Sequence, residues 1–364
     1  MNINRTMRVL ALASLFALPS FSAGAAERSR WFDLQSPPTW ISSVVWVPTL
    51  NRIAFVDPFQ GRLAFYSPTG ILSLPSDSNL LAKDNFLPAL IVGEEANFAL
   101  KLIGSGYKKL DKNMRQIGEL DKLGNHRSKH GSVAPYSLAM ADDYLVGFGS
   151  VDPGLVNGGE GVGFFKVRFA QSSGVDFFRP AKDAIKDADY YLIGHQLVAT
   201  LGGDSYFVEL PSGGEPAILR LAKDGKLKTM KLPVEIPRSF HTVRAIETAM
   251  ASPETAAELF REIEGRSIIT GIFPVQEGGD VFIYLMGRAP SNSGTSWSLF
   301  KITSDGRWVG SVEIPTNANH TTAVVSKDYW FFFEKGRVNA SGTQDIKRML
   351  RIPVAQIRNL KVTQ

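Results

Sequence analysis

Two histidines in matching contexts are the side chains best suited to chemistry in this sequence. His241 and His320 each follow a proline that ends a predicted strand, and each is followed by a threonine and then by the next apolar run. Imidazoles at equivalent strand starts could converge on one point, where neighbouring oxygen ligands would complete a divalent-metal site. We take Asp189, or Asp84 and Asn85, as those ligands.

Such a metal ion could activate water or polarise a substrate carbonyl, or one histidine could act as a general base while Arg238 holds an anion. The competing interpretation is that both histidines hydrogen-bond the backbone where a strand begins, and recur because the surrounding sequence recurs. No His-x-His, His-Glu-x-x-His or Gly-x-Ser-x-Gly pattern decides between the two. The candidate ligand-binding residues are His241, His320, Arg238, Asn319, Asp189, Asp84, Asn85 and Trp40, with His241, His320 and Asp189 as candidate metal ligands.

A repeated hairpin must position these residues. The stretch 297–315 predicts an apolar strand, a turn at Asp305-Gly306 and a second strand closed by proline, and 218–233 repeats this pattern around Asp224-Gly225. Asp-Gly between alternating apolar residues favours a hairpin, because the primed turns need the positive φ that glycine adopts without a side-chain clash. Looser copies occupy 63–75, 107–120 and 163–180.

Further apolar runs precede each hairpin, so each repeat predicts four short strands. The runs 281–286 and 329–333 are continuously apolar, whereas a strand with one wet face should alternate, so these strands need cover on both sides. Stacked four-stranded units supply that cover. The count predicts an all-β propeller of six four-stranded blades, with seven as the fallback. The run 30–34 would supply the missing last strand and close the ring.

The N-terminus predicts export from the cytoplasm. Residues 1–25 form a cleavable secretory signal in which Arg5 and Arg8 precede an apolar stretch. The remaining residues, 26–364, should form one domain that is periplasmic or secreted, monomeric and without a membrane span. The net charge of +5 is mild, and the one dense basic cluster, 122–129, contains no aromatic residue, which argues against nucleic-acid binding. The lack of cysteine excludes disulfides and thiolate metal sites.

The chain resembles the broad class of secreted bacterial six-bladed β-propeller proteins over nearly all of residues 26–364. The resemblance rests on the Asp-Gly hairpins and their terminal Leu-Pro or Ile-Pro pairs, which are fold motifs shared by families of unrelated function. It implies the architecture, with strand starts beside a central channel, and points to no named enzymatic family. One helical insertion is predicted near 252–265, since Ser252 is a good N-cap and Gly265 ends the helix.

Two functions stay open at this point. The first is a binding or scaffold propeller that recognises a protein or a carbohydrate polymer through its channel face, without catalysis. The alternative is a metal-assisted hydrolase or lyase that acts on a sugar or lactone in the central channel. A divalent metal is the one cofactor that the sequence suggests. Alanine at His241 and His320 should abolish activity in the second case and spare partner capture in the first.

Overall fold

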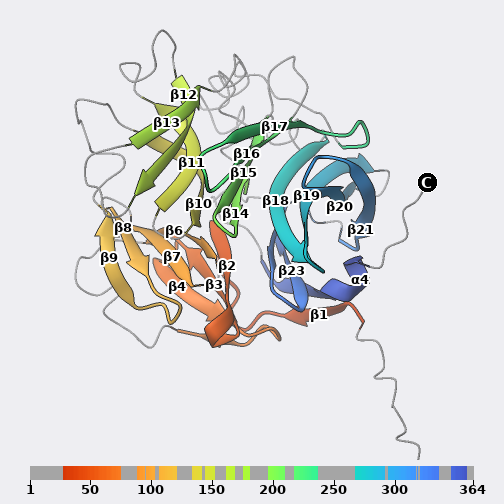
Figure 1. Cartoon of the computed structure of the whole chain (residues 1–364). Helices are drawn as coiled ribbons and strands as arrows, with labels where there is room; N and C mark the ends of the chain where they lie inside the picture. Colours follow the sequence, from red (N-terminus) through yellow and green to blue (C-terminus); the bar gives the residue numbers. More distant parts are fainter. Residues whose placement is uncertain are drawn as a thin grey trace, which may run out of the picture.

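Six four-stranded antiparallel sheets are arranged around one axis, so the prediction of a six-bladed β-propeller is confirmed (Figure 1). The structure is a computed structural model that describes residues 28–74, 88–94, 96–102, 106–120, 133–141, 144–151, 161–168, 175–180, 196–209, 217–236, 267–291, 294–316, 318, 320–335 and 346–358. The predicted secretory signal, 1–25, and the predicted helix near 252–265 lie outside these residues. No helix within them is long and apolar enough to cross a membrane.

The first five blades each use four consecutive strands, with the inner strand first. Blades 1 and 2 comprise β2 (Ser43–Val47), β3 (Arg52–Asp57), β4 (Arg62–Tyr66) and β5 (Leu72–Ser73), then β6 (Pro88–Glu94), β7 (Asn97–Leu102), β8 (Tyr107–Leu110) and β9 (Gln116–Leu120). Blades 3 and 4 comprise β10 (Val133–Ala141), β11 (Tyr144–Val151), β12 (Gly161–Arg168) and β13 (Val175–Pro180), then β14 (Val198–Leu201), β15 (Asp204–Glu209), β16 (Ala217–Leu221) and β17 (Leu227–Lys231). Blade 5 comprises β18 (Ile268–Glu277), β19 (Asp280–Ser291), β20 (Gly294–Thr303) and β21 (Trp308–Ile314).

Blade 6 joins the two ends of the chain. It comprises β22 (His320–Val325), β23 (Tyr329–Lys335), β24 (Arg348–Pro353) and β1 (Arg30–Asp33). β1 lies antiparallel to β24, with Trp31 opposite Leu350 and Phe32 opposite Met349. This pairing confirms the predicted closure, which covers an edge of the sheet that would otherwise be open to other chains. Two short helices complete the described elements, a 3-10 helix η1 (Pro48–Leu50) and helix α4 (Val354–Arg358).

The continuously apolar strands are covered on both faces, as predicted. On one face of β23, Trp330 is fully buried and its ring centroid lies 5.3 Å from those of both Phe273 and Tyr284 in blade 5. On the other face, Phe331 stacks on Trp46 of blade 1 at 5.6 Å. Blade-to-blade packing of this kind therefore forms the core.

The Asp-Gly hairpins differ from the predicted primed turns. Gly225 and Gly306 have the expected positive φ, 85° and 94°, but Asp224 and Asp305 are not among the described residues with positive φ. A type I′ turn needs positive φ at both central residues. Each glycine instead ends a longer turn, as where the Gly225 N–H donates to the Ala222 carbonyl at 2.8 Å.

Candidate functional site

The inner strands enclose a channel on the propeller axis. Each inner strand contacts the next around the ring, from β2 through β6, β10, β14, β18 and β22 back to β2. A cavity of about 690 Å³ lies between them and is lined by residues of all six. This volume is typical of small-molecule sites, which span about 300–1,000 Å³. The channel is therefore the candidate functional site.

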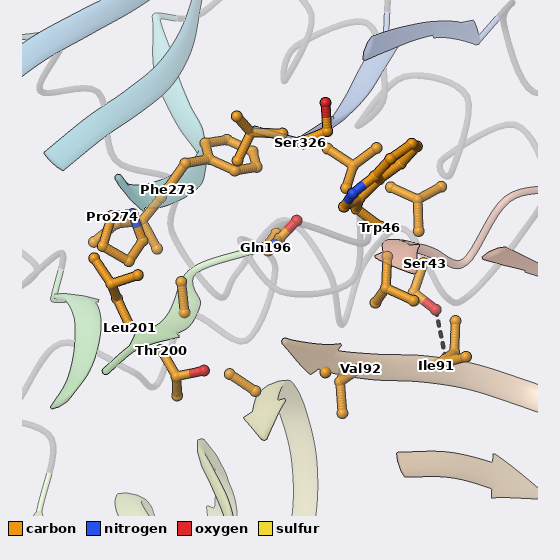
Figure 2. Close-up of a pocket in the computed structure, with 18 of the residues that line it drawn as sticks. Ser43, Trp46, Ile91, Val92, Gln196, Thr200, Leu201, Phe273, Pro274 and Ser326 are labelled. Atoms are coloured by element: carbon orange, nitrogen blue, oxygen red, sulfur yellow. Dashed lines mark hydrogen bonds between the residues drawn. The ribbon is translucent and has the colours of Figure 1, made fainter. Parts of the chain in front are cut away.

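The wall of the channel is mainly apolar. Its labelled apolar side chains come from four different blades (Figure 2) and are Trp46, Ile91, Val92, Leu201, Phe273 and Pro274. The polar side chains labelled between them are Ser43, Gln196, Thr200 and Ser326. No carboxylate or imidazole lines the cavity among the described residues.

Most hydroxyl groups of the wall are used to join blades. The Ser43 hydroxyl accepts from the Ile91 N–H at 2.6 Å, between blades 1 and 2 (Figure 2). The Thr200 hydroxyl donates to the Met140 carbonyl at 2.8 Å, between blades 4 and 3. In the same seam, the Ser137 hydroxyl accepts from the Leu197 N–H at 3.1 Å. These groups hold the ring together, which limits what they can offer a ligand.

Gln196 is the polar side chain best placed to contact a ligand. Its N–H donates to the Thr270 carbonyl at 3.1 Å and its carbonyl accepts from the Ile272 N–H at 2.9 Å, which fixes the backbone against β18. Its side chain extends into the middle of the space that the wall surrounds (Figure 2). The amide has no hydrogen-bond partner within the described part of the chain, and the same holds for the Thr322 hydroxyl. The channel therefore offers a positioned donor and acceptor in apolar surroundings.

The channel has two chemically different mouths. Each blade contains four antiparallel strands, so the chain returns to the same side before it starts the next inner strand. All inner strands thus begin at one mouth, the strand-start mouth, and end at the other, the strand-end mouth. Among the residues that line the cavity, Lys112, Lys327 and Arg358 lie beside the strand-end mouth: Lys112 in the β8–β9 turn, Lys327 after β22 and Arg358 in α4.

Of the sequence-predicted site residues, the structure describes Trp40 and the backbone of His320, each near the start of an inner strand. Trp40 precedes β2 and is half-buried, and its ring meets that of Phe59 edge-on at 5.7 Å. It does not line the cavity. His320 begins β22 opposite Lys335, but only its backbone is described. The residues that lie outside the described part of the chain are His241, Arg238, Asn319, Asp189, Asp84 and Asn85. Their predicted convergence stays a prediction.

The described residues do not by themselves fit a divalent metal ion. No three histidine, cysteine, aspartate or glutamate side chains among them come together as a possible ligand group. The side-chain oxygen atoms that the described wall offers are neutral hydroxyl and amide oxygens, whereas divalent metal sites in proteins usually include carboxylate or imidazole ligands. A metal site would therefore depend on His241, His320 and Asp189, as the sequence predicts.

A buried lysine near the strand-start mouth escaped the sequence analysis. Lys335 is only 6% exposed, and its ammonium group donates to the Ile41 carbonyl at 2.9 Å, which joins the last blade to the first. Burial lowers its pKa to about 8. The sequence contained a signal for it, because Lys335 lies in the same strand as the apolar run 329–333 and is separated from it only by Glu334. Gln196 had no comparable signal, since no repeat or motif contains it.

Comparison with known proteins identifies related folds. The chain matches no protein-family model and no curated protein. Among solved structures, a gluconolactonase from Xanthomonas campestris is similar, with a TM-score of 0.50 and 13% identity over 91% of this chain and 93% of that one. A calcium-binding protein, regucalcin, from Agrobacterium tumefaciens has a TM-score of 0.44 and 12% identity over 90% of this chain and 95% of that one. At such identities the likeness shows the fold alone.

Proposed function

We propose that the protein hydrolyses a small cyclic ester, a lactone, that binds in the central channel. The observation that carries this proposal is the cavity of about 690 Å³, whose mainly apolar wall holds the Gln196 amide without a hydrogen-bond partner among the described residues. The reaction class is supported by the similar propeller described as a gluconolactonase. The proposal narrows the alternative stated above, a metal-assisted hydrolase or lyase acting on a sugar or lactone, which the similar propellers favour over a binding or scaffold role.

The chemistry of the wall favours a lactone that carries an apolar substituent. Trp46, Phe273 and the surrounding aliphatic side chains gain free energy by burying apolar surface, at about 25 cal/mol per Å². The hydroxyl groups of a sugar lactone would lose their water partners there, at roughly 1–3 kcal/mol for each group left unpaired. A lactone with an alkyl chain avoids that cost.

Gln196 can assist such a reaction directly. Water adds to the lactone carbonyl carbon, negative charge grows on the carbonyl oxygen, and the ring C–O bond then breaks to give a hydroxy acid. An amide N–H donated to that oxygen stabilises the developing charge. The groups that activate water would come from the strand-start mouth, where the sequence predicts His241 and His320.

The test is hydrolysis of lactones with increasing alkyl chain length by the purified protein. Rates should rise with chain length until the channel is filled, and Gln196→Leu should lower kcat/KM by about a hundredfold, as for loss of an oxyanion donor. Gln60→Leu, at an exposed turn, is the matched control. Adding chelator and testing the His241→Ala/His320→Ala variant would show whether the predicted metal ligands take part.

Two outcomes would contradict the proposal in different ways. Binding of lactones without turnover would leave a channel that binds but does not hydrolyse. If lactones are neither bound nor hydrolysed, the first hypothesis, capture of a protein or carbohydrate polymer, is favoured instead. We also propose a periplasmic or secreted location from residues 1–25, which cell fractionation tests.

A further inference from the structure

Three cationic side chains from separate parts of the chain line the cavity beside the strand-end mouth. Lys112 belongs to blade 2, Lys327 to blade 6 and Arg358 to the helix that follows β24, and all three line the cavity. The Thr49 hydroxyl donates to the backbone carbonyl of Lys112, which ties the β8–β9 turn to the end of β2. The fold, rather than a run of basic sequence, therefore brings these charges to the channel.

Lys112 and Lys327 carry the positive charge that is available to bind an anionic ligand. Arg358 is already engaged, since its Nε lies 3.5 Å from Glu277 and its Nη2 donates to the Gln276 carbonyl at 3.3 Å. No ion pair involves Lys112 or Lys327 within the described residues.

The acidic groups near this mouth do not cancel the two lysines by any described contact. Glu277 is occupied, because its second oxygen accepts from Lys301 at 2.7 Å. Asp328 follows Lys327 in the chain, is exposed and does not line the cavity. In the connection after β6, Glu94 is described only as backbone and Glu95 lies outside the described residues. An anion at the mouth would therefore meet ammonium groups that have no described partner.

We propose that the channel binds an amphiphilic anion, with its apolar chain along the wall and its acidic group between Lys112 and Lys327. The apolar wall alone would accept a neutral chain equally well, so the lysines set the charge and the direction of the ligand. The channel wall is long enough for an extended alkyl chain, because the five residues of β2 span about 16 Å at the usual rise of a strand. The inference rests on the proposed function in one respect: the hydroxy acid released from an alkyl lactone is such an anion.

The proposal gives the two mouths different roles. A neutral lactone would have no charge to hold it at the strand-end mouth. Its hydrolysis product gains a carboxylate at the former carbonyl carbon, and Lys112 and Lys327 attract that group once the product is released. Product that rebinds should therefore lie in the reverse direction, with its acidic group at the strand-end mouth. The chemistry fits one anionic group on an apolar chain, whether that group is a carboxylate or a phosphate monoester.

Calorimetric titration with decanoate, decanol and decyl phosphate tests this inference without any turnover. Decanoate should bind at least tenfold more tightly than decanol, and added salt should weaken only the charged ligands. The Lys112→Gln/Lys327→Gln variant should lose about tenfold in affinity for decanoate and keep its affinity for decanol, a loss expected for two exposed ion pairs. Lys228→Gln, on the exposed outer strand of blade 4, is the matched control. Comparing decanoate with decyl phosphate shows which anion the mouth prefers.

Equal affinity for decanoate and decanol, or equal decanoate affinity in the wild type and the double variant, would overturn the proposal. Circular dichroism of the variants excludes unfolding as the cause of any loss. If decanoate binds as expected but no lactone is hydrolysed, the anion site stands and the proposed reaction fails. If lactones are hydrolysed but decanoate shows no preference over decanol, the reaction stands and this inference fails.

Discussion

Replacing Lys335 with methionine should remove a pH dependence that this single buried ammonium group imposes on the stability of the ring. Lys335 lies in the seam between the last and first blades, with the Ile41 carbonyl as its one described hydrogen-bond partner. Burial lowers its pKa from 10.5 to about 8, because the charged form loses its water. The unfolded chain restores that water, so the two states titrate differently.

The sign and size of the effect follow from this difference. Between about pH 8 and 10.5, the unfolded chain binds a proton that the folded protein has released, so the free energy of unfolding rises with pH. At about 1.4 kcal/mol per pKa unit, the whole window is worth roughly 3 kcal/mol, and the interval from about pH 7.5 to 9.5 roughly 2 kcal/mol. Below this window both states are protonated and the contribution is constant.

Urea denaturation of the wild type and of Lys335→Met at about pH 7.5, 8.5 and 9.5 measures this contribution. The wild type should gain roughly 2 kcal/mol relative to the variant across the series. The range stops there because burial raises the pKa of Tyr66, Tyr107 and Tyr284 in the folded protein. At higher pH these tyrosines would ionise in the unfolded chain first, which would lower the free energy of unfolding. Lys228→Met, on an exposed strand, should follow the wild type.

The free energy of unfolding at a single pH is a less direct measure of the buried charge than its change with pH. Methionine removes the buried charge but leaves the Ile41 carbonyl without its donor, at roughly 1–3 kcal/mol, so the two effects oppose each other at neutral pH. A difference between the wild type and Lys335→Met that stays constant from pH 7.5 to 9.5 would refute the reasoning. It would mean that water reaches the ammonium group in the folded protein.

Two further variants test the packing of the ring. Gly147→Ala should lose about 1–3 kcal/mol, since the new Cβ would lie 2.4 Å from the Ser137 carbonyl oxygen, whereas Gly118→Ala, whose nearest contact is at 3.7 Å, should be nearly neutral. Equal urea midpoints for the two glycine variants would contradict this account. Asp57→Ala should cost about 1–3 kcal/mol, because the buried carboxylate accepts from both the N–H and the hydroxyl of Thr39. An unchanged midpoint would show that this contact does not hold the start of blade 1.

Much of the fold could be predicted because its signals are local and repeat. The apolar runs of β19 and β23 predicted strands covered on both faces, and in β23 Trp330 packs on blade 5 while Phe331 packs on blade 1. Closure of the ring was predictable because the last repeat lacked a fourth strand, and the apolar run 30–34 belonged to no other blade. The type of the Asp-Gly turns was not, since the same dipeptide serves a two-residue turn and the longer turn that ends at Gly225.

The site was harder to predict because it depends on where distant residues meet. Matching contexts drew attention to His241 and His320, but a match in sequence says only that two positions are equivalent in the repeat. Lys112, Lys327 and Arg358 share no motif, and they become neighbours of one channel only through the order of the blades. Gln196 stands alone before a short strand, where propensity gives no reason to select it.

The inter-blade contacts explain why so few residues should decide what the channel binds. A ring of separate sheets needs polar ties across its seams, and the hydroxyl groups of Ser43, Ser137 and Thr200 supply them from within the wall. Hydroxyl groups committed in this way are poor ligand contacts, because a ligand would have to replace a bond that stabilises the ring. Selectivity in the described channel therefore falls to the unpaired amide of Gln196 and to the charge at the strand-end mouth. The first would recognise a carbonyl and the second an acid, which are the two functional groups that lactone hydrolysis interconverts.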